Sequence, residues 1–539
     1  MAARFSCFIG TVFVVLVLFT GSLPTVVAQE EIARFGGDIN NGFGTSLGAA
    51  GDVDGDGWDD VIIGAPEHVE FTKQIGMVQV FSGRTGVELF TFVGEQEFGW
   101  FAQSVDGSGD VNGDGFSDLI VGEPCSDRNG DCSGTAWIYS GMDGSVLLQV
   151  DGDEPWDGLG HRVRGVGDID LDGKADFAVS SVFADLDGTG RSEGRVRVYS
   201  GQDASVIHEF WGSSLDYGMS GFGWDLAGNA DVNADGFPDL IVGAIFDDAD
   251  GTSGMDPSVT GSVIVYSGKD GGVLHQLYGD HFDSLGAAVD GLADLNGDGM
   301  DEFVASALES SSELGYVRVH SGSNGAILFE HQGLGVATDD FFGASLSRAG
   351  DVNLDGFEDV LVGSNPRNYH EEGCRIYVDG YARLFSGATG AELYRFQSDF
   401  DGDQFGSHVG RAGDFNRDGL PDVLIGAPAD RIPSTAILYS GNDLFLRLLP
   451  RIVQQGDLID LTTLEGRPFF PTAMFLVDVN GMPVWSMVGG IGFFDSTLRR
   501  SIIAVVPPGL SSLTLRFQSF AIDGSGRLID SAREVVRFE

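Results

Sequence analysis

Acidic side chains recur in this chain at a spacing suited to binding a hard cation. Seven nine-residue segments place carboxylate or amide oxygens at positions one, three, five and nine, with glycine at position six. The oxygen-bearing residues are Asp52, Asp54, Asp56 and Asp60; Asp110, Asn112, Asp114 and Asp118; Asp168, Asp170, Asp172 and Asp176; Asp231, Asn233, Asp235 and Asp239; Asp294, Asn296, Asp298 and Glu302; Asp351, Asn353, Asp355 and Asp359; and Asp414, Asn416, Asp418 and Asp422.

Donors of this kind predict calcium. Ca²⁺ takes about six to eight hard oxygen ligands, whereas Mg²⁺ keeps more water and soft metals prefer Cys or His. The glycine permits the sharp turn that returns the chain to the ion. Position twelve, where an EF-hand carries glutamate, is apolar in all seven segments, so we expect strand-loop-strand sites. We predict up to seven structural Ca²⁺ ions. Polar turns without metal are the alternative, and the fifth loop, with Glu302, is the first candidate for that alternative.

The acidic segments belong to a repeat whose period lies between 57 and 63 residues. Each copy has a strand pattern before the acidic loop, an apolar strand after it, a third strand such as 196–199 before Ser-Gly, and a short fourth strand. No copy contains an amphipathic helix pattern. Four antiparallel strands repeated seven times predict a seven-bladed β-propeller. A solenoid would need shorter units and capping repeats, which are not apparent.

The ends of the repeat region predict how the ring closes. Residues 32–38 resemble the fourth-strand stretch 393–399, so we expect the N-terminal strand to complete blade seven beside the strand that ends at Ser440. We assign residues 29–443 to the propeller. Strand patterns at 473–479, 483–487, 501–506, 512–521 and 534–538 predict that residues 444–539 form a small β-sandwich. The predicted fold class is therefore all-β.

Residues 1–28 have the pattern of a secretory signal peptide. Arg4 precedes an apolar run over 8–19, and Val26 and Ala28 form a small-residue cleavage pattern. The run is shorter than the roughly 20 residues of a comfortable membrane span, although an uncleaved anchor is the alternative. We expect a secreted or cell-surface protein without an integral membrane span after cleavage. In that setting, Cys125 and Cys132 are spaced for a loop-closing disulfide.

The charge balance restricts the partners. Asp and Glu number 81 against 30 Lys and Arg, which gives a formal charge of −51. Nucleic acids and anionic lipids need basic contacts, so we expect neither as a partner. The acids lie in short recurrent clusters rather than in one tail, which favours cation binding at repeated sites.

The short motifs on either side of the acidic loops resemble those of a known family. Phe43-Gly44 and Gly64-Ala65-Pro66 flank the first acidic loop, and Phe405-Gly406 and Gly426-Ala427-Pro428 flank the last. This pattern is similar to the FG-GAP repeats of integrin α-chain propellers and of secreted bacterial proteins, over about residues 31–443. The second repeat departs with Gly122-Glu123-Pro124 and the fifth with Leu285-Gly286. We see no long stalk, C-terminal membrane span or inserted adhesion domain, so we do not expect an integrin.

The resemblance implies that ligands meet the face opposite the metal loops. The loops between strands two and three and the connections between blades form that face. Aromatic residues expected near it are Trp100, Trp156, Trp211, Tyr217 and Tyr369. Aromatic rings stack on sugars or anchor proteins. For Trp100 and Trp156, however, packing between blades is the favoured interpretation.

These patterns predict a binding or adhesion module for an extracellular protein or polysaccharide. The alternatives are a calcium-dependent, polysaccharide-active enzyme and a structural component of a cell-surface assembly. Ser-His-Asp, HExxH and nucleotide-binding motifs are not apparent, and the acidic loops account for nearly all the paired carboxylates that a glycosidase would use. We therefore do not expect an enzyme.

Overall fold

The computed structural model describes most of the repeat region and the strands that follow it. The described residues are 31–39, 41–186, 188–213, 219–247, 260–280, 283–308, 314–335, 341–365, 369–371, 374–376, 380–398, 403–417, 419–429, 433–441, 459–460, 473–479, 482–483, 503–504, 514–522 and 528–537. The predicted signal peptide lies outside them.

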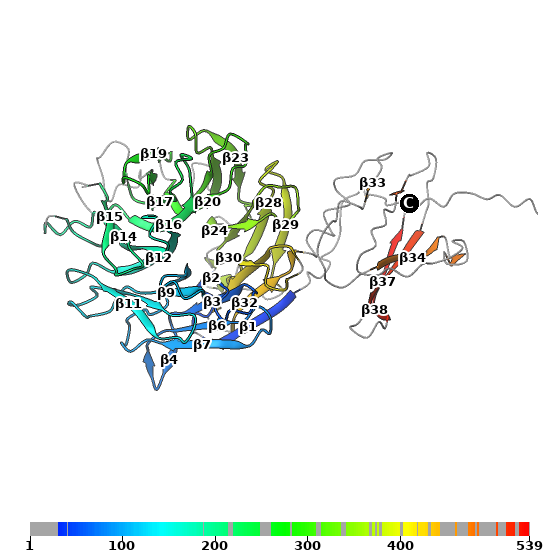
Figure 1. Ribbon diagram of the computed structural model, residues 1–539, viewed down its shortest axis with the longest axis horizontal. Coiled ribbons are helices and arrows are strands. Elements are labelled where there is room, and N and C mark those ends of the chain that lie inside the picture. The colour runs from blue at the N-terminus through cyan, green and yellow to red at the C-terminus, as the bar shows by residue number, and fades with distance from the viewer. Residues whose placement is uncertain are drawn as a thin grey trace, which may run out of the picture. The chain divides into compact units, whose positions relative to one another are not determined.

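The repeats form seven four-stranded antiparallel sheets, which lie around a common axis like the blades of a propeller (Figure 1). Blades one to three consist of β2 (Ser46–Gly51), β3 (Asp60–Ala65), β6 (Met77–Phe81) and β7 (Glu88–Val93); β8 (Ser104–Gly109), β9 (Asp118–Glu123), β10 (Thr135–Tyr139) and β11 (Val146–Asp151); and β12 (Leu159–Gly167), β13 (Asp176–Ser181), β14 (Arg195–Tyr199) and β15 (Val206–Trp211). Blades four to six consist of β16 (Phe222–Ala230), β17 (Asp239–Ala244), β18 (Ser262–Tyr266) and β19 (Val273–Tyr278); β20 (Leu285–Leu292), β21 (Glu302–Ala307), β22 (Tyr316–His320) and β23 (Ile327–Gln332); and β24 (Phe342–Gly350), β25 (Asp359–Ser364), β28 (Tyr381–Phe385) and β29 (Glu392–Gln397). The predicted seven-bladed fold is confirmed.

The N-terminal strand closes the ring. Blade seven consists of β30 (His408–Gly413), β31 (Asp422–Ala427), β32 (Pro433–Tyr439) and β1 (Glu31–Ile39), and β1 pairs antiparallel with β32. The innermost strands contact their neighbours all the way around, including β2 with β30. Residues from the two ends of the propeller therefore share one sheet, and β32 is left without a free edge.

Apolar side chains pack between blades rather than within them. Seven clusters of buried residues each combine side chains of two neighbouring blades. Each contains the apolar residue of the Phe-Gly signature, which is at most 2% exposed in every repeat: Phe43, Phe101, Leu159, Phe222, Leu285, Phe342 and Phe405. The signature thus joins adjacent blades.

The backbone explains why glycine follows this apolar residue. In all seven repeats, the residues on both sides of it have positive φ, from 44° at Phe341 to 95° at Gly286. Glycine adopts this conformation at least cost. At Gly406, a Cβ would also lie 2.3 Å from the carbonyl oxygen of Tyr381. Blade two tolerates the conformation at Ala102, with φ of 72°.

Two blades carry an additional short hairpin. The hairpin of β4 (Val69–Glu70) and β5 (Lys73–Gln74) extends the connection between β3 and β6, and that of β26 (Tyr369–Glu371) and β27 (Cys374–Ile376) extends the connection between β25 and β28. Both lie between strands two and three of their blades.

The chain divides into two compact units, of which one spans Gln29–Leu444. Beyond it, the described strands form a four-stranded antiparallel sheet in the order β35 (Met482–Pro483), β34 (Ala473–Val479), β37 (Thr514–Ile522) and β38 (Leu528–Arg537). A two-stranded ladder joins β33 (Ile459–Asp460) and β36 (Ile503–Ala504). The strands agree with the predicted β-structure, and their packing into a sandwich stays a prediction. Among the described residues, no helix has the length and apolar character needed to cross a membrane.

Candidate metal centres and the opposite face

Each acidic loop joins the first and second strands of its blade. Because the strands alternate in direction, all seven loops lie at the same end of the propeller. Position nine is the first residue of the second strand, as Asp60 is of β3. The connections between strands two and three, and those between blades, lie at the other end.

The first three oxygen-bearing positions fold the loop around their own side chains. In the first loop, Asp52 accepts hydrogen bonds from the backbone N–H groups of Asp56 at 3.0 Å and Gly57 at 2.9 Å. Asp54 accepts from Asp56 at 3.1 Å, and Asp56 accepts from Trp58 at 3.1 Å. The corresponding bonds recur in the second, third, fourth and sixth loops. The carboxylates are therefore held on the inner side of each turn.

The position-nine carboxylate is buried and ties the loop to the third strand. Asp60 accepts from the N–H of Val53 at 2.8 Å and, through its other oxygen, from the N–H of Gly83 at 2.8 Å. Gly83 belongs to the Ser-Gly turn after β6. Equivalent pairs of bonds are made by Asp118, Asp176, Asp239 and Asp359.

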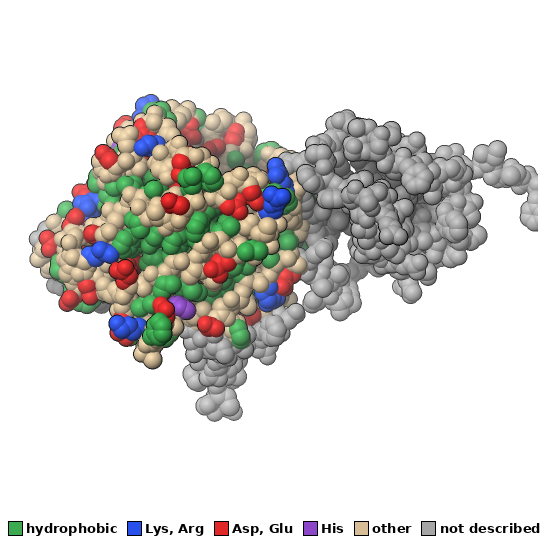
Figure 2. Space-filling model, turned by 60° about the horizontal axis from the view of Figure 1, so that its bottom comes forward, with side chains coloured by type: hydrophobic (Ala, Val, Ile, Leu, Met, Phe, Trp, Pro, Cys, Tyr) green, Lys and Arg blue, Asp and Glu red, His purple; other side chains and the backbone are tan. Residues whose placement is uncertain are grey.

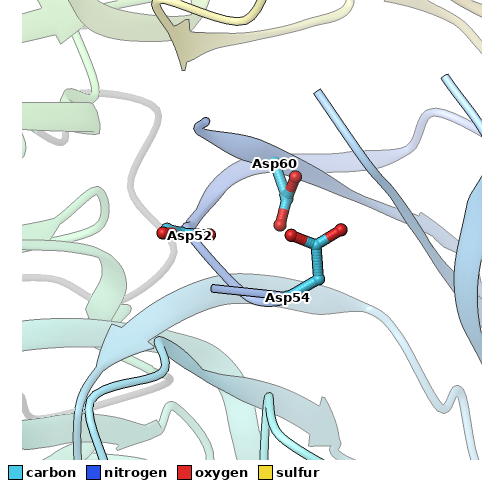
Figure 3. A group of neighbouring side chains, drawn as sticks. All are labelled: Asp52, Asp54 and Asp60. Atoms are coloured by element: carbon cyan, nitrogen blue, oxygen red, sulfur yellow. The ribbon is translucent and has the colours of Figure 1, made fainter. Parts of the chain in front are cut away.

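Three loops bring three carboxylates together, with ligand oxygens within 4.8 Å of one another. The groups are Asp52, Asp54 and Asp60, shown in Figure 3; Asp168, Asp170 and Asp176; and Asp294, Asp298 and Glu302. Position three is asparagine in the second, fourth, fifth, sixth and seventh loops, which therefore carry three acidic side chains each, against four in the first and third loops. Asp418 of the seventh loop lies outside the described residues.

The fifth loop differs in how its ninth residue is held. The longer Glu302 accepts from the N–H of Leu295 and, at 2.5 Å, from the amide of Asn296. The amide of Asn416 in the seventh loop likewise donates to Asp422, at 3.5 Å. In these two loops, an asparagine amide group rather than its oxygen faces position nine.

Burial makes the position-nine carboxylates hard to ionise without a cation. Burial raises the pKa to about 7 in Asp60, Asp239 and Glu302, to about 6 in Asp118 and Asp176, and to about 8 in Asp359. Among the described residues, only Arg84 and Lys269 form ion pairs with a loop carboxylate. Each lies 3.9 Å from a position-five aspartate. Among the described residues, these six carboxylates have backbone donors but no ion pair with a basic side chain, and the hard oxygen set fits a divalent cation.

The pKa values give a testable pH dependence for the metal-free protein. Because the folded pKa is raised above that of the unfolded chain, each buried carboxyl group stabilises the fold fully below about pH 4. That contribution is lost as the pH rises through about 6 to 8. We expect the free energy of unfolding of dialysed, metal-free protein to fall steadily from pH 5 to pH 8 in urea titrations.

Calcium should reverse this trend, because it holds the carboxylates in their ionised form and competes with protons below about pH 7. The stabilisation by calcium should therefore be greater at pH 8 than at pH 5, and Asp60→Asn should weaken the pH dependence of the metal-free protein. A metal-free protein that becomes more stable toward pH 8 would contradict this account.

The end opposite the acidic loops exposes aromatic side chains. The prediction that Trp100 and Trp156 pack between blades is wrong, since they are 42% and 62% exposed. Both precede the first strand of a blade and have positive φ, at 59° and 72°. Phe101, the residue after Trp100, enters the core while the indole of Trp100 stays outside; Trp156 lies three residues before the buried Leu159. Trp211 is half-buried, with Arg195 over its ring at 5.2 Å. Tyr217 and the side chain of Tyr369 lie outside the described residues.

Further exposed apolar side chains at this end were not singled out in the sequence. Phe98, Phe183 and the hairpin tip residue Phe71 are all exposed. The backbone around them is fixed: Phe98 donates its N–H to Gln74 at 2.7 Å, and Trp156 donates to Asp131 at 2.8 Å. On the face of the propeller drawn in Figure 2, hydrophobic side chains reach the surface between scattered charged ones.

The predicted disulfide is not formed. Cys125 and Cys132 are both free thiols. Burial and the hydrogen bond with Cys132 raise the pKa of the Cys125 thiol to about 12. The two side chains are therefore neighbours, as their spacing predicted, but they are joined by a hydrogen bond rather than a covalent bond.

Comparison with known families agrees with this architecture. The FG-GAP repeat matches residues 43–81, 101–139 and 405–439, which lie in blades one, two and seven. The chain therefore contains FG-GAP repeats in these three blades. Its other four blades keep the same strand order and the same pair of positive-φ residues, so the repeat extends around the ring.

Integrin α chains are among the proteins to which this chain is similar. The chain is 30% identical to integrin alpha-V of Gallus gallus over 36% of its own length, 32% identical to integrin alpha-8 of Mus musculus over 36%, and 32% identical to integrin alpha-5 of Xenopus laevis over 38%. The matched regions cover 19%, 19% and 20% of those relatives. The chain thus spans about a fifth of their length.

Proposed function

We propose that this protein is a calcium-binding module of the extracellular space or cell surface that binds a protein or a polysaccharide. Its metal ligands are the oxygen-bearing residues of the seven acidic loops. Calcium there is structural, and the partner meets the opposite end of the propeller. The homology to integrin α chains supports a role in binding or adhesion rather than catalysis.

The exposed indoles of Trp100 and Trp156 carry this proposal. Large aromatic side chains are rarely left in water without a use, because burying one stabilises a complex by about 1.5–3 kcal/mol. Here they lie in neighbouring inter-blade connections, on a backbone held by hydrogen bonds. A rigid, pre-positioned aromatic surface binds with little loss of conformational entropy.

The acidic residues around the indoles limit the chemical classes of partner that can bind there. Exposed acidic residues accompany them, among them Glu95, Glu97, Asp153 and Glu154. Aromatic rings beside carboxylates suit a partner with basic side chains, or a sugar that offers C–H faces and hydroxyl groups. An acidic polysaccharide or an acidic protein surface would be repelled.

An array of extracellular matrix proteins and polysaccharides, probed with the calcium-loaded chain, tests the proposal. For each bound partner, the double substitution Trp100→Ala and Trp156→Ala should weaken binding at least tenfold, as expected for central aromatic contacts. A matched control is Met142→Ala, which removes a side chain of similar exposure (61%) from the end that carries the acidic loops.

Two outcomes would contradict the proposal. Equal loss of binding in the Met142 variant would place the contact at the wrong end, and unchanged binding in the tryptophan variant would remove its main support. A polysaccharide hydrolysis assay run beside the array would reveal an enzyme instead.

A further inference from the structure

The seven innermost strands line a partly open cavity of about 60 Å³ on the propeller axis. Side chains from all seven blades line it, and most of them lie at or just before the start of a first strand. The cavity is therefore nearer the end of the propeller opposite the acidic loops. At roughly 15 Å³ for each water molecule, it has room for a few waters or one small ion.

Two arginines make this cavity positive in a strongly acidic protein. The Nε of Arg162 lies 3.2 Å from one oxygen of Asp225, and Nη2 of Arg164 lies 3.4 Å from the same oxygen. The other oxygen of Asp225 accepts the backbone N–H of Val289 at 3.0 Å. Two guanidinium groups thus share one carboxylate, and the charged groups that line the cavity sum to a positive charge.

Further charged side chains of the first strands lie outside the cavity lining. Asp106 and Asp290 act on Arg164, and Arg411 acts in turn on Asp106. His408 does line the cavity, and its burial together with the charge of Arg162 lowers its pKa to about 3. His408 is therefore neutral at physiological pH, and the positive charge of the cavity comes from the arginines.

Two side chains that line the cavity have unused hydrogen-bonding capacity. Arg162 has five N–H groups, and within the described chain it donates only to Asp225 and to the carbonyl oxygen of His161. In the neighbouring blade two, the side-chain oxygen Oε1 of Gln103, which also lines the cavity, is buried and finds no donor among the described residues. A ligand that satisfies both must accept hydrogen bonds from a guanidinium group and donate one to an amide oxygen.

We propose that this cavity binds one small oxyanion that carries a hydroxyl group, of the class of inorganic hydrogen phosphate. The unprotonated oxygens of the ion accept hydrogen bonds from Arg162. The planar guanidinium group of arginine favours bidentate contacts with phosphate. The hydroxyl of the ion donates to Gln103. The volume of the cavity is sufficient for one such ion. This site is separate from the acidic loops and does not depend on the proposed partner.

Equilibrium dialysis of the full chain against micromolar radiolabelled phosphate, with calcium present, tests the site. We expect one phosphate per chain. Sulfate, which lacks a hydroxyl at neutral pH, should compete at least tenfold more weakly, because it leaves Gln103 unsatisfied. Both Arg162→Gln and Gln103→Met should weaken phosphate binding at least tenfold.

Arg411→Gln is the matched control. Arg411 lies on β30, is exposed and does not line the cavity. The substitution removes the same charge as Arg162→Gln. It should leave the affinity for phosphate within about twofold of that of the original protein. If Arg162→Gln prevents folding because Asp225 loses a partner, Gln103→Met, which changes no charge, still decides the question. Absence of bound phosphate, equal binding of sulfate, or unchanged binding in Gln103→Met would each overturn the proposal.

Discussion

Adding calcium to the metal-free protein should raise the midpoint of thermal unfolding by about 10 to 20 °C. An ion present at 100 times its dissociation constant stabilises the fold by about 2.7 kcal/mol per site. The unfolding entropy of the propeller unit, Gln29–Leu444, is about 0.9 kcal/mol/K at 2.1 cal/mol/K per residue. Three filled sites then give about 10 °C, and seven give about 20 °C. Differential scanning calorimetry beside metal counting measures both quantities.

Magnesium at the same concentration is the control, because it binds loops of flexible oxygen ligands less well than calcium. Asp168→Asn, which alters one of the three-carboxylate groups, should lower the calcium-induced shift by about one site's share. A shift below about 2 °C with calcium, or an equal shift with magnesium, would remove the argument for structural calcium sites.

The loops also contact one another, so the effect of an ion should reach beyond its own blade. Ser117 of blade two donates its N–H to the carbonyl oxygen of Asp52 in blade one at 3.0 Å, and Ala175 of blade three donates to Asp110 in blade two at 3.0 Å. The backbone N–H of Asp414 in blade seven donates a hydrogen bond to the carboxylate of Asp59 in blade one at 3.2 Å. Ordering one loop therefore orders the edge of its neighbour.

The sequence predicted the propeller well because its repeats make local and global signals agree. The position-nine residue begins a buried strand in every blade, so the acidic pattern and the apolar run mark the same boundary. The closing strand was predictable because 32–38 repeat the fourth-strand pattern. Glycine at position six was also informative, since Gly57 and its equivalents have positive φ.

Features that depend on three-dimensional neighbours were not predictable. The amino-acid sequence around Trp100 does not show that the backbone, with positive φ, directs the indole outward while Phe101 enters the core. The shared carboxylate of Asp225 joins blade four to Arg162 and Arg164 of blade three across 63 and 61 residues of sequence. The thiol contact of Cys125 and Cys132 was predictable from spacing, but its bonding state was not.

Phe35→Ala should lower the free energy of unfolding by about 3–5 kcal/mol, the cost of removing a buried phenylalanine from a packed core. Phe35 lies on the closing strand β1 and is 6% exposed. Its ring centroid lies 4.4 Å from that of Phe81 in blade one and 6.2 Å from that of Phe415 in blade seven. The side chain thus joins the two blades that the closing strand must hold together. Urea unfolding of the calcium-loaded protein measures the loss.

Arg34→Ala on the same strand separates closure of the ring from general damage to β1. Arg34 is partly exposed and pairs with Glu31 at 2.6 Å, an interaction worth at most about 1 kcal/mol at the surface. Only the phenylalanine variant should also expose β32 as a free edge, with concentration-dependent association as the sign. Equal destabilisation by the two substitutions would mean that β1 contributes through its backbone pairing alone, and that the ring does not depend on the core beneath it.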